Sequence, residues 1–358
     1  MGNDSAGRIT SCRWEHGKVV DEGFPLEDVS DLLHREDSLI WVDLCEPDHA
    51  GLRALAGELG LDPHAVEDAV SAGERPKATR HAKHTFLTVY ATRLERGPEP
   101  EASGDAGGPN RDGAADDTEP AGPESRLRTA RISAFVLPGG IITVRSSDAF
   151  DMQPVLDRWN DDPELLRLGA GALVHGLLDT VVDGHFEAIQ QLDDAVEDLE
   201  DLLFDERGRT HTVQVRTYRL RKELVELRRV VLPMRDVVNA VLRHRGELDQ
   251  RHTELDGFYD DLYDHVLRAA EWTESLRDMV TTIFETNLSL QDARLNTVMK
   301  KLTGWAAIIA VPTAVTGWFG QNVPYPGFQQ PWGVTFSAAV IAGVAVALYV
   351  VFRRKGWI

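Results

Sequence analysis

The chain has 358 residues, with 58 Asp or Glu against 38 Lys or Arg and a formal net charge of −20. This acidic balance argues against nucleic acid or an anionic lipid surface as a partner and favours cations. The two cysteines, Cys12 and Cys45, provide neither a disulfide framework nor a thiolate metal site, which is typical of a protein in a reducing cytosol.

The N-terminal part alternates short β-type runs with helical runs, which predicts an α/β or α+β domain. Arg8–Trp14, Leu39–Leu44 and Thr85–Thr92 have the composition and patterning of strands. Between the second and third of these runs, Asp48 is a plausible N-cap of one helix and Pro63 can open another.

Residues 95–125 interrupt this domain with a stretch rich in Gly, Pro, Ala and acids. Such a composition buries too little apolar surface to offset the entropy of ordering, so we expect a disordered loop. Strands resume at Thr129–Leu137 and Ile141–Arg145, with a turn at Pro138, Gly139 and Gly140. The loop is therefore predicted to be an insertion within one domain.

Helical periodicity replaces strand signals after residue 151. Gly171–Phe204 has apolar residues at helical spacing and dense acids on the other face. His211–His244 is basic in its middle and is predicted to pair with it as an antiparallel hairpin, kinked by Pro233. A third helix begins near His252 and meets no breaker before Gly304, so its ~50 residues would form a stalk of ~75 Å.

The C-terminal stretch contains no Asp, Glu, Lys or Arg between Leu302 and Phe352. That length crosses a ~30 Å hydrocarbon layer twice if the chain turns back in the Pro- and Gly-rich segment Gly320–Pro331. Basic residues flank both ends of this hairpin, at 300–301 and at 353–355, which places both ends in the cytoplasm. A buried helical hairpin in a soluble core is the alternative, but ordinary core helices run only ~8–20 residues.

Asn322 lies where the first span would meet the outer loop, after the small residues Gly317 and Gly320. If several subunits converge there, its amide oxygen can contact a hydrated cation. Asn before Val-Pro is equally suited to a turn, and spacing alone favours that interpretation.

The segment NTVMKKLTGWAAIIAVPTAVTGWFGQN, residues 296–322, closely resembles the first transmembrane helix and signature of the CorA family of divalent-cation transporters, whose hallmark is Gly-Met-Asn. LDPHAVEDAVSAGERPK, VRTYRLRKELVELRRVVLPMRDVV and FYDDLYDHVLRAAEWTESLRDMV also resemble that family. The resemblance runs from Leu39 to the end, apart from the insertion. It implies a funnel-shaped homopentamer with an αβα cytoplasmic domain, a long helical stalk and two C-terminal transmembrane helices, the first lining the pore.

Together, patterning and resemblance divide the chain into seven parts. These are the αβα domain with its insertion (1–160), the acidic and basic helical hairpin (161–250), the stalk (251–301), the first span (302–319), the outer loop (320–331), the second span (332–352) and a basic tail (353–358).

The resemblance also assigns pore positions. These are Gly320, Gln321 and Asn322 at the outer mouth, Thr313 deeper in the first span, Leu302 and Met299 at a hydrophobic constriction, and Asn296 and Glu285 in the stalk. Leu302, Ala306, Ile309 and Thr313 fall on one helical stripe, which agrees with a pore-lining face. Ordinary helix packing is the alternative for the two constriction residues.

Regulatory metal sites between subunits are the second implication of the resemblance. By motif they match Glu67, Asp68, Asp179 and Asp261. Carboxylates suit Mg²⁺, which prefers oxygen ligands and retains several waters. The alternative is that they are solvated surface acids, the default among 58 such residues.

The sequence therefore predicts a multi-pass protein of the inner cell membrane that takes up Mg²⁺ passively, with Mg²⁺ as both substrate and regulatory ligand. Its expected partners are the lipid bilayer, divalent cations and four further copies of itself, without nucleic acid or enzymatic activity. Gln321 replaces the usual Met of the signature, which weakens the assignment of the cation. Two alternatives are a Zn²⁺, Co²⁺ or Ni²⁺ transporter, with or without proton coupling, and a non-conducting membrane-anchored metal sensor. The hairpin has neither the His nor the Cys that softer cations prefer.

Overall fold

The computed structural model describes residues 8–35, 37–71, 73–95, 125–203, 210–248, 253–321, 324, 327–328 and 330–358. The predicted insertion lies almost wholly outside the described residues, as does Asn322. The chain forms two compact units, Met1–Thr281 and Thr282–Ile358, and each is described by itself.

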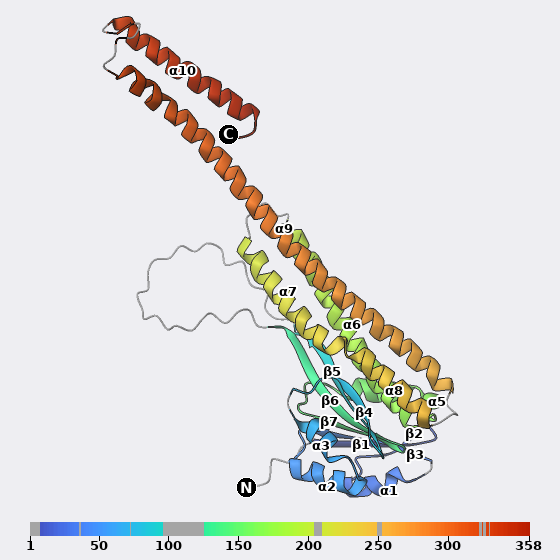
Figure 1. The fold of residues 1–358 in the computed structure, drawn as a ribbon. Helices are drawn as coiled ribbons and strands as arrows, with labels where there is room; N and C mark the ends of the chain where they lie inside the picture. Colours follow the sequence, from blue (N-terminus) through green and yellow to red (C-terminus); the bar gives the residue numbers. More distant parts are fainter. Residues whose placement is uncertain are drawn as a thin grey trace. The chain divides into compact units, whose positions relative to one another are not determined.

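The first unit is built on one seven-stranded mixed sheet (Figure 1). Its strands are β1 (Arg8–Glu15), β2 (Lys18–Glu22), β3 (Ser38–Cys45), β4 (Lys77–Arg80), β5 (Thr85–Leu94), β6 (Leu127–Leu137) and β7 (Gly140–Arg145), in the spatial order β2-β1-β3-β7-β6-β5-β4. All neighbours are antiparallel except β3 and β7, which pair in parallel with Trp41 opposite Ile141. The five strands predicted from patterning are confirmed, whereas the short edge strands β2 and β4 were not predicted.

The hairpin between β6 and β7 requires glycine for a steric reason. A Cβ atom at Gly140 would lie 2.1 Å from the carbonyl oxygen of Ile40, and one at Gly139 would lie 2.3 Å from that of Leu33. Because both neighbours are backbone atoms, no side-chain rotation relieves the contact. The two glycines thus allow the start of β7 to lie close to β3 and to the helix that ends at Leu33, just before β3.

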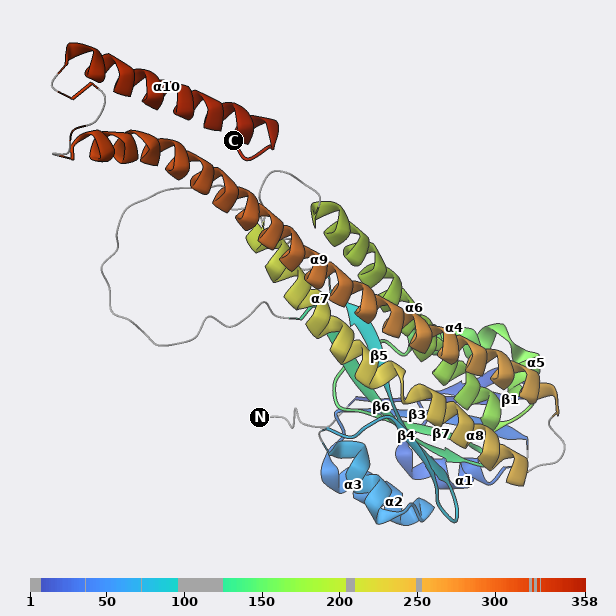
Figure 2. The same ribbon diagram turned by 45° about the horizontal axis from the view of Figure 1, so that its top comes forward.

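Helices cover both faces of the sheet, which confirms the αβα arrangement (Figures 1 and 2). One face is covered by the short 3₁₀ turn η1 (Leu26–Asp28), α1 (Val29–Leu33), α2 (His49–Leu59) and α3 (Pro63–Val70). The other face is covered by α4 (Gln153–Asp161), α5 (Pro163–Leu166), α6 (Ala170–Leu203), α8 (Met234–Leu248) and the start of α9 (Thr253–Phe319). Alternation along β3 serves both cores, because Leu39 and Trp41 belong to one and Ile40 and Val42 to the other. As predicted, Asp48 caps α2 by accepting a hydrogen bond from the amide of Ala50 at 3.2 Å.

A helical layer extends from the sheet through α6, α7 (Thr210–Val231) and α9. Buried positions of α9 in this unit alternate by four and three residues, which is the spacing of left-handed coiled-coil packing. They are Leu255, Tyr259, Leu262, Val266, Ala269, Thr273, Leu276 and Val280. The buried stripe aligns the long helix with the helices beside it.

The predicted second helix, His211–His244, is corrected to two helices. α7 ends at Val231 and α8 begins at Met234, because Pro233 has no amide hydrogen to donate to the preceding turn. The Pro233 carbonyl instead accepts from the amides of Asp236 and Val237 and starts the new helix. The break lets α8 cover the sheet near β4 while α7 continues along α6.

The second unit contains the remainder of α9 and α10 (Pro331–Arg354). By length and composition, both helices are able to cross a membrane, and almost none of their most apolar stretches is buried. Ring contacts join them within this unit, with centroids 6.5 Å apart for Trp305 and Tyr349 and 6.4 Å for Phe319 and Phe336. Pro312 lies inside α9, where the Thr316 hydroxyl donates to its carbonyl at 2.8 Å.

Candidate functional site

The predicted pore-lining stripe is an exposed face of α9 in the single chain. Leu302 is 62% exposed and Ile309 is 67% exposed, and Ala306 and Thr313 are exposed beside them. Met299 is exposed one turn before Leu302. From Leu302 to Thr313 this apolar stripe has a single hydroxyl and lies exposed in the uncharged segment of α9, which favours packing against lipid or further copies of the chain.

The described part of the predicted outer mouth follows directly on the end of α9 at Phe319. The amide of Gly320 donates to the carbonyl of Thr316 at 2.8 Å, and that of Gln321 donates to the carbonyl of Trp318 at 3.3 Å, so the last turn tightens. The Gln321 side chain is exposed. The position of Asn322 is outside the described residues, so its predicted role stays a prediction.

Two more of the predicted pore positions lie on α9 before the uncharged segment. Glu285 and Asn296 are both exposed. They precede Leu302 along the same continuous helix, Thr253–Phe319.

The first pair of predicted regulatory carboxylates lies on α3. Asp62 caps this helix by accepting from the amides of His64 and Ala65, at 2.9 and 3.3 Å. Glu67 is exposed, whereas Asp68 is half-buried. The helix thus fixes both carboxylates on a surface of the αβα domain.

Asp68 is held by a lysine that the sequence analysis did not single out. The Lys77 ammonium lies 2.7 Å from an oxygen of Asp68 and 2.7 Å from one of Glu74. Burial alone would lower the pKa of Lys77, but its hydrogen bonds to the two carboxylates raise the pKa by more, so the net shift is upward. Lys77 therefore stays charged, and Asp68 already has a cationic partner.

The other two predicted carboxylates lie on α6, which carries Asp179, and on α9, which carries Asp261. Burial raises the pKa of Asp179, although Arg158 lies 3.0 Å away and opposes the rise. Asp261 is exposed and lies 3.8 Å from His265. The charges of both aspartates act on His175, which packs on α9 against the ring of Tyr259.

The ion pairs of these carboxylates involve different partners, Lys77 on β4 for Asp68 and Arg158 on α4 for Asp179. Across the part of the chain that the structure describes, no group of three or more His, Cys, Asp or Glu side chains is arranged to hold a metal ion. The partners Lys77 and Arg158 were missed by sequence reasoning, because nothing local marks which basic residue reaches a given carboxylate.

A buried ion pair elsewhere has a structural role. Arg145 on β7 lies 2.6 Å from Asp43 on β3, and both side chains are almost fully buried. Thr143 donates to the same carboxylate at 2.7 Å, and Trp41 donates to Thr143 at 3.0 Å. This network joins the parallel pair of strands and has no solvent access for a cation.

An αβα domain connected by one continuous helix to an uncharged two-helix hairpin defines an integral membrane protein with a large water-exposed domain. The chain belongs to the CorA-like Mg²⁺ transporter family, whose model matches residues 36–104 and 117–354. It is thus a divalent metal ion transporter with two C-terminal transmembrane helices, and not an enzyme.

Several relatives agree with this assignment. The cobalt/magnesium transport protein CorA of Thermotoga maritima is 27% identical over 94% of this chain and 88% of its own length. YfjQ of Bacillus subtilis (strain 168), whose name assigns it provisionally to metal ion transport, is 24% identical over 98% of both chains. The complete structure of the CorA magnesium transporter from Methanocaldococcus jannaschii has the same fold, with a TM-score of 0.69, 22% identity and 98% coverage of both chains.

Proposed function

We propose that this protein is a homopentameric channel through which Mg²⁺ enters the cytoplasm down its electrochemical gradient. The observation that carries the proposal is the exposed stripe of Leu302, Ala306, Ile309 and Thr313 in an uncharged segment of α9. Five copies of that stripe would line an axial pore, with Leu302 and Met299 as its hydrophobic constriction. Membership in a family described by Mg²⁺ transport supports the choice of cation.

Selection would occur at the outer mouth, through the amides of Gln321 and Asn322, and deeper in the first span, through the hydroxyl of Thr313. Mg²⁺ dehydrates reluctantly, so neutral oxygen atoms that hydrogen-bond its water shell suit it better than direct ligands. Residues 303–351 contain no His or Cys, the ligands expected for Zn²⁺, Co²⁺ or Ni²⁺. Gln321 in place of the usual Met is the feature that favours a different cation.

Regulation would occur at the carboxylates of the first unit. Asp261 is exposed on α9 and Glu67 is exposed on α3, so both are accessible to a neighbouring copy. Their oxygen atoms match the ligands that Mg²⁺ takes in proteins. A cation held between Asp68 of one subunit and Asp261 of the next, with Glu67 and Asp179 nearby, would offset like-charge repulsion and keep the ring closed.

The test is uptake of Mg²⁺, Zn²⁺, Co²⁺ and Ni²⁺ into liposomes that contain the purified full chain, with an imposed membrane potential. We expect Mg²⁺ flux that stops when the cytosolic side reaches high Mg²⁺. Flux of Zn²⁺ without Mg²⁺ would support the softer-cation alternative, and no flux of any cation would support the sensor.

Two substitutions separate the mouth from the gate. Asn322→Ala should abolish flux while the oligomer survives, because the hydrated ion loses its amide partner.

Asp261→Asn should leave flux intact but no longer inhibited by cytosolic Mg²⁺. Asp264→Asn, which removes an exposed acid from the next turn of the same helix, is the matched control and should behave as the wild type. Equal loss of inhibition in both variants would refute a specific role for Asp261.

A further inference from the structure

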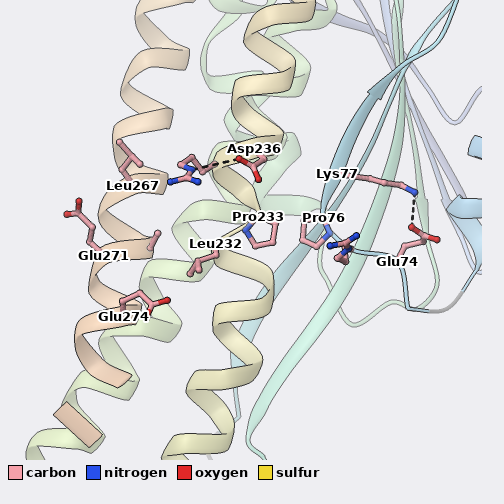
Figure 3. A pocket seen from close by; sticks show the side chains of 12 residues that line it. Glu74, Pro76, Lys77, Leu232, Pro233, Asp236, Leu267, Glu271 and Glu274 are labelled. Carbon is pink, nitrogen blue, oxygen red and sulfur yellow. Dashed lines mark hydrogen bonds and ion pairs between the residues drawn. The ribbon is translucent and has the colours of Figure 1, made fainter. Parts of the chain in front are cut away.

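Lys77 forms an ion pair with Asp68, a carboxylate that the proposed regulatory site would use. It begins β4, directly after the loop from α3, and its ammonium lies 2.7 Å from both Asp68 and Glu74. Figure 3 shows Lys77 and Glu74 facing each other beside a cavity of about 860 Å³ whose far wall includes Glu271 and Glu274 of α9. The lysine therefore lies among acids on an open, water-accessible face.

The position of Lys77 is fixed by the backbone and not by the ion pair alone. Lys77 pairs with Thr88 in the register of β4 and β5, and the buried Pro76 restricts the chain just before it. The side chains of Lys77 and Asp68 are each 32% exposed, so neither is free in solvent. A cation tethered this closely has a high effective concentration at the carboxylate.

A divalent cation and this ammonium cannot use the same Asp68 oxygen atoms at once. Mg²⁺ that binds the Oδ2 atom of Asp68, directly or through a water, displaces the ammonium that lies 2.7 Å from this atom, and Mg²⁺ that binds Oδ1 meets the repulsion of the same ammonium nearby. Lys77 also contacts Glu74 at 2.7 Å and can keep this partner when it leaves Asp68. Binding of the cation to Asp68 thus leaves neither the lysine nor Asp68 without a charged partner.

We infer that Lys77 is a tethered counter-ion that competes with the regulatory divalent cation for Asp68 and so sets the cytosolic concentration at which the cation binds. This inference rests on the regulatory part of the proposed function. It assigns to Lys77 the role of lowering the affinity of the site, so that the site responds to high rather than trace concentrations of free Mg²⁺.

The test is titration calorimetry of Mg²⁺ binding to the full chain in detergent, with Co²⁺ as a second probe. Lys77→Met should lower the half-saturating concentration by about fivefold, the upper range for loss of one partly exposed ion pair. Lys77→Arg retains a tethered cation and should bind as the wild type. Arg75→Gln removes an exposed cation that lines the same cavity and should have little effect.

The decisive comparison repeats Lys77→Met in an Asp68→Asn background. Competition for Asp68 predicts that the substitution of Lys77 then changes nothing. If Lys77→Met raises the Mg²⁺ affinity equally with and without Asp68, or if Arg75→Gln raises it as much, the effect is one of general charge and the inference is overturned.

The inference and the proposed function fail in distinguishable ways. If Asp68→Asn weakens Mg²⁺ binding but Lys77→Met leaves it unchanged, the regulatory site stands and the role of Lys77 is refuted. If neither Asp68→Asn nor Asp261→Asn changes Mg²⁺ binding, the regulatory site itself is refuted and the inference falls with it.

Discussion

The junction of α6 with the sheet should make the first unit sensitive to acid through a buried histidine. His185 is 1% exposed, and its Nε2 donates to the carbonyl of Tyr90 on β5 at 2.8 Å. The carbonyl of the preceding residue, Gly184, accepts from the Thr92 hydroxyl at 3.1 Å. Two hydrogen bonds from adjacent residues of α6 therefore join this helix to β5. Burial lowers the pKa of His185 from 6.5 to about 4, although the hydrogen bond to Tyr90 opposes the shift.

The sign and size of the effect follow from this shift. The unfolded chain protonates His185 near pH 6.5, whereas the folded chain resists protonation down to about pH 4. Stability from the neutral imidazole is therefore complete above pH 6.5 and is lost as the pH falls toward 4. At ~1.36 kcal/mol per pKa unit, the free energy of unfolding should fall by about 2 kcal/mol between pH 7 and pH 5 because of His185 alone.

The assay is urea unfolding of the full chain in detergent at pH 7 and pH 5, followed by tryptophan fluorescence. His185→Gln retains a donor for the Tyr90 carbonyl but does not titrate, so its pH-dependent loss should be smaller by about 2 kcal/mol. His34→Gln alters an exposed histidine and serves as the control. If His185→Gln keeps the full pH dependence of the wild type, the reasoning from burial is wrong.

Three further predictions concern the first unit. Gly140→Ala should cost more than ~2 kcal/mol in a urea titration, because the added Cβ meets a carbonyl oxygen rather than a movable side chain. Asp43→Asn should cost about 3–5 kcal/mol in the same assay, since it leaves the buried Arg145 without its anionic partner; a change near zero would contradict this. Deletion of residues 98–122 should leave the oligomer and its cation flux intact, as light scattering and liposome uptake would show, because their composition cannot form a core.

Local patterns in the sequence were enough for the elements whose signals are local. The uncharged run from Leu302 to Phe352 predicts two spans because a hydrocarbon layer excludes charge, whatever the rest of the chain does. The continuous helix α9 follows from the absence of a breaker before Gly304, and the strand β3 from its apolar run. The pore and regulatory positions came from resemblance and not from these patterns.

Tertiary structure decided what depends on residues far apart in sequence. Pro233 allows either a kink or a break, and the need of α8 to cover the sheet near β4 selects the break. The short edge strand β4 exists because β5 offers it a partner, which no local pattern records. In the same way, the spacing of the acids gives no sign that Asp68 faces Lys77 while Asp179 faces Arg158, because ion pairs depend on which surfaces the fold brings within a few ångströms.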